Sequence, residues 1–356
     1  MQAKVDSNPP QPSVTALSVA WGFTRALDTE FRYLFSKQEL QISKHLCLVG
    51  NQSLSGLTWA LCTGLLSLPY SIQQSFFNRT IVPAHDHVVM LRKLMIKSKI
   101  EEAIQNGVKQ IVFLGGGYDI RALMTAIKYP VKVYELDRGA TRECKLRGLQ
   151  SIPQEFGLGK LEIKQDDDGT VTINDKLYYI ECDFIKDDLQ TKLRSNHFTK
   201  EEKKLVIAEG LTAYLNVEDN LNLLETLQGL MNPQDELLIS YITDGKKSQF
   251  FDASLRSAGE THKLTLAPTE VIAFVEKKGF AISHQFDATR LLNDIGDTED
   301  ANVYASNQLQ LREYYVCLHQ GSVTNRDINQ IPFYNVPIPK NAELDSSKEY
   351  SPAWKI

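Results

Sequence analysis

The chain has 356 residues, of which 42% are hydrophobic and 23% are charged. This composition is typical of a globular protein that buries a sizeable core, and it excludes wholesale disorder. The length fits one large catalytic domain with added segments. The formal net charge is −5 and no long run of Lys or Arg is present, which argues against a nucleic-acid partner.

The first hundred residues are predicted to form a helical layer. Apolar residues recur at three- and four-residue intervals from Val14 to Phe35 and again from Val88 to Ile104. Between them, Leu46 to Asn78 contains no charged residue and no histidine, and Leu54 to Tyr70 is mostly apolar. Its Ser, Thr, Gly and Pro residues and the scarcity of basic flanks favour a buried or site-covering helix over a membrane span or a membrane-surface contact.

A β-α-β unit is predicted next. Asn106-Gly107 ends the preceding helix, and Lys109 to Leu114 has the pattern of a short buried strand. A glycine run follows, then a helix from Asp119 to Lys128 and a second strand from Val131 to Glu135. We therefore expect an α/β fold with a doubly wound, Rossmann-like parallel sheet.

The remaining elements continue the α/β alternation. A hairpin with turns at Asp168-Gly169 and Asn174-Asp175 is expected to lead into a strand from Leu177 to Glu181. The later predicted elements are a strand Leu205–Ala208, a helix Val217–Leu230, a strand Glu236–Ile242, a helix Thr269–Lys278 and strands Ala281–Phe286 and Arg312–Leu318. The expected organisation is a helical layer and lid over residues 1–105, a cofactor-binding core over 106–320 and a tail over 321–356.

No metal site or disulfide framework is expected. The five cysteines are scattered without a C-x-x-C pair, and no two histidines have metal-ligand spacing. The triple acid Asp166-Asp167-Asp168 is interpreted as a solvated turn, because the rest of a calcium-loop pattern is absent. The N-terminus lacks an apolar signal core, so the expected location is a reducing cytoplasm.

The glycine run Gly115-Gly116-Gly117 lies where a predicted strand meets a helix. Glycine lets the backbone approach a ligand closely at such a turn. Asp137 lies 137 − 117 = 20 residues beyond the last glycine, at the end of the next strand. At that spacing a carboxylate can accept hydrogen bonds from the ribose hydroxyls of an adenosine ligand. Dinucleotide enzymes and methyltransferases share these two features.

Three observations favour S-adenosylmethionine over a dinucleotide. Ile120 replaces the third glycine of the dinucleotide fingerprint. Asp119 places a negative charge near the helix N-terminus, which would repel a pyrophosphate and would suit an ammonium or sulfonium group. Downstream, Asp183 and Glu209 follow further strands, and the carboxyl ends of parallel strands line one crevice. Asp183 is well placed there for an adenine amino group.

Four segments, taken together and in order, resemble the leucine carboxyl methyltransferase family, including its bacterial members. They are residues 110–119 (QIVFLGGGYD), 133–137 (VYELD), 182–183 (CD) and 207–215 (IAEGLTAYL). The resemblance extends roughly from residue 14 to residue 317. Two departures are visible, since Gly116 stands where alanine is common in the family and Ile120-Arg121 replaces a Thr-Arg or Thr-Thr pair. Neither is expected to abolish binding.

The resemblance implies S-adenosylmethionine as the cofactor and gives roles to individual residues. From the residues alone, Arg92 could equally be a surface cation and Tyr214 a core side chain, and Lys93 is expected to be solvated. The implied roles are Arg92 on the cofactor carboxylate, Gly115 and Gly117 in the turn, Asp137 on the ribose, Asp183 on the adenine, Glu209 near the methionine moiety and Tyr214 near the reacting centre.

The expected activity is O-methylation. A carboxylate acceptor is ionised near neutral pH and needs no base, whereas a hydroxyl acceptor does. No His/Asp dyad is evident, and the candidate histidines have the pattern of solvated loop residues; they are His85, His87, His197 and His262. The acceptor is expected to be a carboxylate or hydroxyl of a small molecule or a protein C-terminus. An NAD-linked oxidoreductase and a catalytically silent binding or membrane-associated protein stay open as alternatives.

Overall fold

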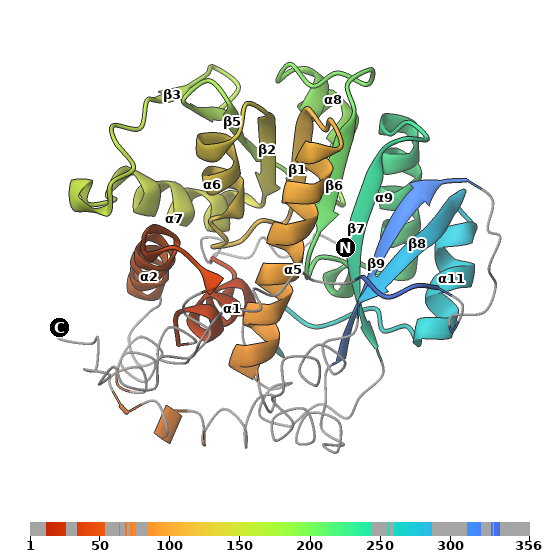
Figure 1. The fold of residues 1–356 in the computed structure, drawn as a ribbon, viewed down its shortest axis with the longest axis horizontal. Helices are drawn as coiled ribbons and strands as arrows, with labels where there is room; N and C mark the ends of the chain where they lie inside the picture. The colour runs from red at the N-terminus through yellow and green to blue at the C-terminus, as the bar shows by residue number, and fades with distance from the viewer. Residues whose placement is uncertain are drawn as a thin grey trace, which may run out of the picture.

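The computed structural model describes residues 12–25, 34–53, 64, 68–69, 72–73, 75, 85–243, 255–256, 260–286, 312–321, 329 and 331–334. Within these residues the centre of the protein is a nine-stranded sheet in the order β3-β4-β5-β2-β1-β6-β7-β9-β8, with helices packed around it (Figure 1). This confirms the predicted Rossmann-like α/β fold.

Five strands form the parallel part of the sheet: β1 Gln110–Leu114, β2 Lys132–Asp137, β5 Leu177–Glu181, β6 Lys204–Ala208 and β7 Glu236–Thr243. Four strands add antiparallel edges: β3 Ile163–Gln165, β4 Val171–Ile173, β8 Phe280–Phe286 and β9 Arg312–Gln320. The predicted strands and the predicted hairpin are therefore confirmed. The pairing of β9 between β7 and β8 was not predicted.

The central strand β1 shows why the sheet has helices on both faces. All five of its residues are buried. Ile111 and Phe113 belong to one hydrophobic cluster, while Val112 and Leu114 belong to another on the opposite face. Successive side chains of a strand point to opposite faces, so a strand between two covered faces is apolar throughout.

The described helices are α1 Val14–Arg25, α2 Lys37–Gln52, α5 His85–Gln105, α6 Arg121–Lys128, α7 Gly139–Gln150, α8 Leu189–Arg194, α9 Val217–Leu230 and α11 Pro268–Glu276. The helix predicted over 217–230 has those bounds. The helix predicted from Asp119 begins at Arg121, because the Asp119 carboxylate accepts the Arg121 N–H and so lies outside the first turn. Three helices, α2, α7 and α8, were not predicted.

The order of the sheet places a crevice beside β1. β2 and β5 lie on one side of β1, while β6 and β7 lie on the other. The chain direction across the sheet therefore reverses between β1 and β6, and ligands of doubly wound folds bind at the carboxyl ends of the strands at such a switch point. Helices α1, α2 and α5 pack against one another at this end of the molecule (Figure 1).

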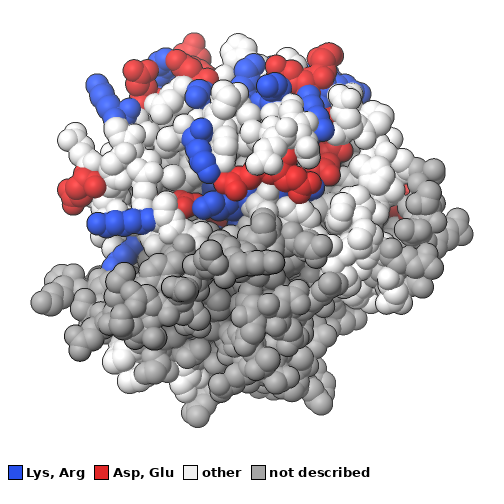
Figure 2. Space-filling model, viewed as in Figure 1, with Lys and Arg blue, Asp and Glu red and all other residues white. Residues whose placement is uncertain are grey.

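Two further expectations concern surfaces. On the face seen in Figure 2, acidic and basic side chains are mixed over the described surface, without a one-sign field of the kind that binds nucleic acid. Among the described helices, none is long and apolar enough to cross a membrane. Most of the apolar stretch from residue 54 to residue 70 lies outside the described residues, and so does the predicted continuation of α1 between residues 26 and 33.

Candidate cofactor and acceptor site

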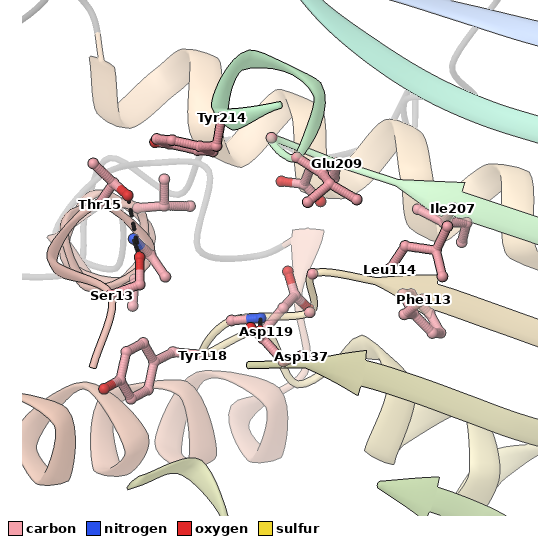
Figure 3. A pocket seen from close by; sticks show the side chains of 18 of the residues that line it. Ser13, Thr15, Phe113, Leu114, Tyr118, Asp119, Asp137, Ile207, Glu209 and Tyr214 are labelled. Carbon is pink, nitrogen blue, oxygen red and sulfur yellow. Dashed lines mark hydrogen bonds between the residues drawn. The ribbon is translucent and has the colours of Figure 1, made fainter. Parts of the chain in front are cut away.

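A cavity of about 320 Å³ lies at the carboxyl ends of β1, β2, β5 and β6 (Figure 3). Its wall brings together all seven residues that the sequence predicted for the site, although they come from five separate segments of the chain. These residues are Arg92, Gly115, Gly117, Asp137, Asp183, Glu209 and Tyr214. The geometry of each group then decides what it can bind.

The glycine turn is held by Asp137. Gly115 and Gly117 both have positive φ, at 73° and 54°, a conformation that favours glycine. One carboxylate oxygen of Asp137 accepts the Gly117 N–H at 2.7 Å and the other accepts the Arg138 N–H at 2.7 Å. An ionised carboxylate has about four acceptor positions, so two remain for neighbouring hydroxyls. An oriented, half-buried carboxylate of this kind fits the two hydroxyls of a ribose.

The middle glycine of the run is required by Glu135. A Cβ at Gly116 would lie 2.7 Å from the Glu135 Cγ. Glu135 is 2% exposed and forms an ion pair with Lys145 at 2.6 Å. Lys145 also donates to the carbonyl oxygen of Asp119. The Glu135–Lys145 pair therefore packs against the turn, and it requires glycine at position 116 of this chain.

Replacing Gly116 with alanine should destabilise the fold by about 1–3 kcal/mol, because the new methyl group overlaps a fixed, buried side chain. The measurement is the free energy of unfolding in urea. Gly229→Ala is the matched control, since Gly229 lies inside helix α9 and its Cβ would meet only the flexible end of Gln190 at 3.0 Å. Alanine is favoured there by helix propensity. Equal stability of the two variants would contradict the overlap with Glu135.

Glu135 should also give stability a pH dependence. Burial raises the pKa of Glu135 to about 7 against the opposing effect of Lys145. Between pH 4.5 and about 7 the folded state keeps a proton that the unfolded state releases, so the free energy of unfolding should fall as the pH rises through this window. Glu135→Gln should flatten this fall and the exposed control Glu201→Gln should not. Urea unfolding across the window tests it, and an unchanged slope in Glu135→Gln would count against this role.

Five charged side chains form a buried cluster beside the turn, which we call the charge cluster: Arg92, Lys93, Asp119, Arg121 and Glu209. Glu209 pairs with the Arg92 Nε at 2.6 Å and also with Arg121, and Asp119 pairs with Arg121 at 2.6 Å and also with Lys93. Every side chain of the cluster is at most 14% exposed. Three cations and two carboxylates leave one positive charge in excess.

The charge cluster corrects two sequence-based expectations. Lys93 is buried rather than solvated, because it lies between Asp119 and the ring of Phe23. Asp119 is bound by protein cations: burial raises its pKa, but Arg121 and Lys93 outweigh burial and hold that pKa well below its usual range. Its charge is therefore already balanced within the protein, and the ammonium or sulfonium role suggested by its position is not needed to explain it.

Arg121 carries a signal for an anionic ligand. Its Nε and Nη2 donate to Asp119, while Nη1 is buried and has no hydrogen-bond partner among the described residues. A buried guanidinium nitrogen without an acceptor is costly, and a carboxylate in the cavity would satisfy it. The donor set of Arg92 and Arg121 with the acceptor Glu209 thus fits the carboxylate and ammonium of an amino acid. Arg121 was not among the predicted site residues, because nothing in its neighbouring sequence marks it as a ligand-binding residue.

Asp183 and Tyr214 lie at two further parts of the wall. The Asp183 carboxylate follows β5, accepts the Ile185 N–H at 3.0 Å and lines the cavity together with Phe184. Tyr214 ends the short 3-10 helix Thr212–Tyr214, and its ring meets that of His262 at 5.2 Å. In Figure 3 Tyr214 lies across the cavity from Asp137. Tyr214 lines the cavity, and its predicted place near the reacting centre stays a prediction.

The wall also contains groups that the sequence did not indicate. Thr15, in the first turn of α1, donates its N–H to Glu260 at 2.9 Å, and its hydroxyl contacts the same carboxylate. Glu260 is 7% exposed and also faces Arg138 at 3.8 Å. The contact between Thr15 and Glu260 joins residues 245 positions apart, so no local pattern could have shown it.

A comparison with protein-family models finds one match. Residues 70–228 match the model for leucine carboxyl methyltransferase, and the match spans β1, the glycine turn and every predicted site residue. This segment is therefore similar to the leucine carboxyl methyltransferase family. The chain is therefore a methyltransferase that uses S-adenosylmethionine, as the sequence predicted. No curated protein matches the chain significantly.

Two solved structures illustrate what this chain is similar to. A DUF574 family protein from Streptomyces avermitilis is 12% identical, with a TM-score of 0.44, over 66% of this chain and 83% of that protein. A candidate methyltransferase from Thermobifida fusca is 10% identical, with a TM-score of 0.46, over 79% of this chain and 94% of that protein. At these TM-scores the likeness assigns no role to any residue.

Proposed function

We propose that this methyltransferase methylates a carboxylate oxygen of its acceptor. The observation that carries the proposal is the charge cluster, which leaves a buried positive excess at the cavity wall. In addition, no histidine or cysteine is among the described residues that line the cavity. An anionic acceptor suits both features, because it offsets the charge and needs no base.

In this proposal the cofactor lies along the carboxyl ends of the strands. Asp137 accepts the ribose hydroxyls, Asp183 accepts the adenine amino group, and Gly115 and Gly117 let the backbone approach the ligand. Arg92 and Arg121 bind the carboxylate of the methionine moiety, and Glu209 binds its ammonium. When bound, S-adenosylmethionine supplies a methyl group on a positively charged sulfur, which leaves as a neutral thioether.

The residues of the chain then have little proton chemistry to perform. An acceptor carboxylate oxygen forms the new bond to carbon without losing a proton, so the site must align the two reactants and exclude water. We assign Tyr214 a positioning hydrogen bond to the acceptor, since its side chain faces the cavity opposite Asp137 (Figure 3). Lys93 attracts the negative acceptor toward the reacting centre by its charge.

The test combines cofactor binding with the chemical nature of the product. Calorimetry should show binding of S-adenosylmethionine and not of NAD. Radiolabelled methyl groups transferred to small molecules of a cell extract should be released as methanol by mild base, because methyl esters are base-labile and methyl ethers are not. A base-stable product would contradict methylation of a carboxylate and would indicate methylation of a hydroxyl instead. If the protein binds S-adenosylmethionine but transfers no methyl group to any acceptor, the alternative of a catalytically silent binding protein is supported.

We place this activity in a reducing cytoplasm. The cysteines at 47, 144, 182 and 317 are free and buried, which supports that location, and the fifth cysteine, at 62, lies outside the described residues. Buried free thiols are typical of proteins that do not meet an oxidising compartment.

A further inference from the structure

The cavity has a second end, away from the glycine turn, which we call the helical end. It is formed by α1, α2, the residues before α2, and α5. The side chains that line it are Val19, Ala20, Phe23, Phe35, Glu39, Ser43, Lys93 and Lys97. Its relation to the charge cluster is given by Lys93, which pairs with Asp119 on one side and lies over the Phe23 ring on the other. The helical end and the charge cluster are therefore adjacent, and Lys93 belongs to both.

The helical end is apolar on its floor. The rings of Phe23 and Phe35 meet edge to face, with centroids 4.9 Å apart and an interplanar angle of 89°, and both are buried. Val19 and Ala20 lie one turn before Phe23 on the same face of α1 and also line the cavity. Such a pair of rings recognises an apolar group. None of the proposed contacts of the ribose, adenine or amino acid of the cofactor involves these rings.

Cations lie above this apolar floor. The Lys93 Nζ is 5.3 Å from the centroid of the Phe23 ring, and the Lys97 Nζ is 5.4 Å from that of Phe35. Lys97 is also held by Glu39, at 2.9 and 3.1 Å from its two oxygens. Lys93 and Lys97 are four residues apart on α5, so they face the same side. The helical end thus pairs an apolar floor with two ammonium groups.

The charges favour an anion in this place. The charge cluster has an excess of one positive charge, and the Lys97–Glu39 pair is neutral. The carboxylate and ammonium of a bound methionine moiety cancel each other, while its sulfonium adds a further positive charge. A negative acceptor is the remaining way to balance charge in a site with little water.

We infer that the helical end is the acceptor site and that the acceptor is a small monocarboxylic acid with an aromatic or branched apolar body. This inference rests on the proposed carboxylate methylation and adds the substrate class and the residues that select it. The apolar body packs on Phe23 and Phe35, and Lys93 and Lys97 attract the carboxylate toward the methyl group. The apolar floor excludes dicarboxylic acids, because their second carboxylate would lie against Phe23 and Phe35. Neutral alcohols carry no charge that the two lysines can attract.

The test is methyl transfer to named acceptors. Phenylacetate and 4-methylpentanoate should form base-labile methyl esters, whereas succinate and 2-phenylethanol should not. Phe35→Ala and Lys97→Met should each raise the KM for phenylacetate by about 10-fold or more with little change in kcat, because they remove ground-state binding. Lys97→Arg should restore most of the loss. Lys128→Met is the matched control, since Lys128 also pairs with a glutamate, Glu101, and lies over a ring, Tyr129, but outside the cavity.

Separate readouts distinguish the failure of this inference from that of the proposed function. Affinity for S-adenosylmethionine should be the same in Phe35→Ala, Lys97→Met and the wild type, which also shows that the variants are folded. Equilibrium binding of phenylacetate in the presence of S-adenosylhomocysteine should weaken in both variants. If esters form only on a peptide C-terminus, or if both variants keep their phenylacetate affinity, the inference is overturned while carboxylate methylation stands. If no base-labile ester forms at all, the proposed function fails with it.

Discussion

Replacing Asp137 with asparagine is expected to weaken the binding of S-adenosylmethionine by about 100-fold, which corresponds to about 3 kcal/mol. Both carboxylate oxygens of Asp137 accept backbone N–H groups, one from Gly117 and one from Arg138. The asparagine amide must turn its NH₂ group toward one of these donors. The turn then loses a hydrogen bond, and the ribose loses the charged acceptor that it requires in the proposed site.

Isothermal titration calorimetry measures this effect, and thermal unfolding shows whether the fold is retained. Asp175→Asn is the control, because Asp175 lies in an exposed turn with φ at 53°, where asparagine is well accepted. The control should bind the cofactor as the wild type does. Unchanged affinity in Asp137→Asn would remove Asp137 from the cofactor site.

The largest loss of stability is expected for Asp119→Asn, at about 3–5 kcal/mol, because a buried ion pair is broken on one side only. Asp119 is the carboxylate partner of Lys93 and also pairs with Arg121. Its removal raises the excess charge of the cluster from one to two. Unfolding in urea measures the change in stability. The control is Asp175→Asn, which breaks the exposed pair of Lys164 and Asp175 and should have a small effect.

A double variant tests the cause of that loss. Asp119→Asn combined with Lys93→Met returns the cluster to the charge excess of the wild type, so it should recover part of the lost stability. Recovery is expected because replacing both partners of a buried pair costs less than removing one. If the double variant is less stable than Asp119→Asn, charge imbalance is not the reason for the loss.

Local patterns were enough to predict the parts of the fold that position the cofactor. Short buried strands, the glycine turn and the helix Val217–Leu230 depend on neighbours in sequence, and they form where expected. Asp137, Asp183 and Glu209 were predicted together because parallel strands end at one edge of a sheet. The start of α2 also has a local sequence signal, since Ser36 and Glu39 form the capping box that begins the helix.

Contacts between distant segments could not be predicted in this way. Lys93 has the sequence pattern of a surface lysine on a helix, and only the approach of Asp119 and the Phe23 ring makes it a buried residue. Arg121 has no local sequence signal for a site residue, yet it bridges Asp119 and Glu209. The helical end likewise depends on the packing of three helices, which determines which faces of α1 and α5 meet.

The place of β9 in the sheet affects how this protein is made. β9 is the last strand of the described sheet in chain order, yet it lies inside the sheet, between β7 and β8. While the ribosome is still translating residues before 312, β8 lacks the strand that joins it to β7, and β7 has an open edge. Open edges invite pairing with other chains. A nonsense mutation shortly before β9 should therefore yield an aggregating polypeptide, even though every predicted cofactor ligand has already been synthesised.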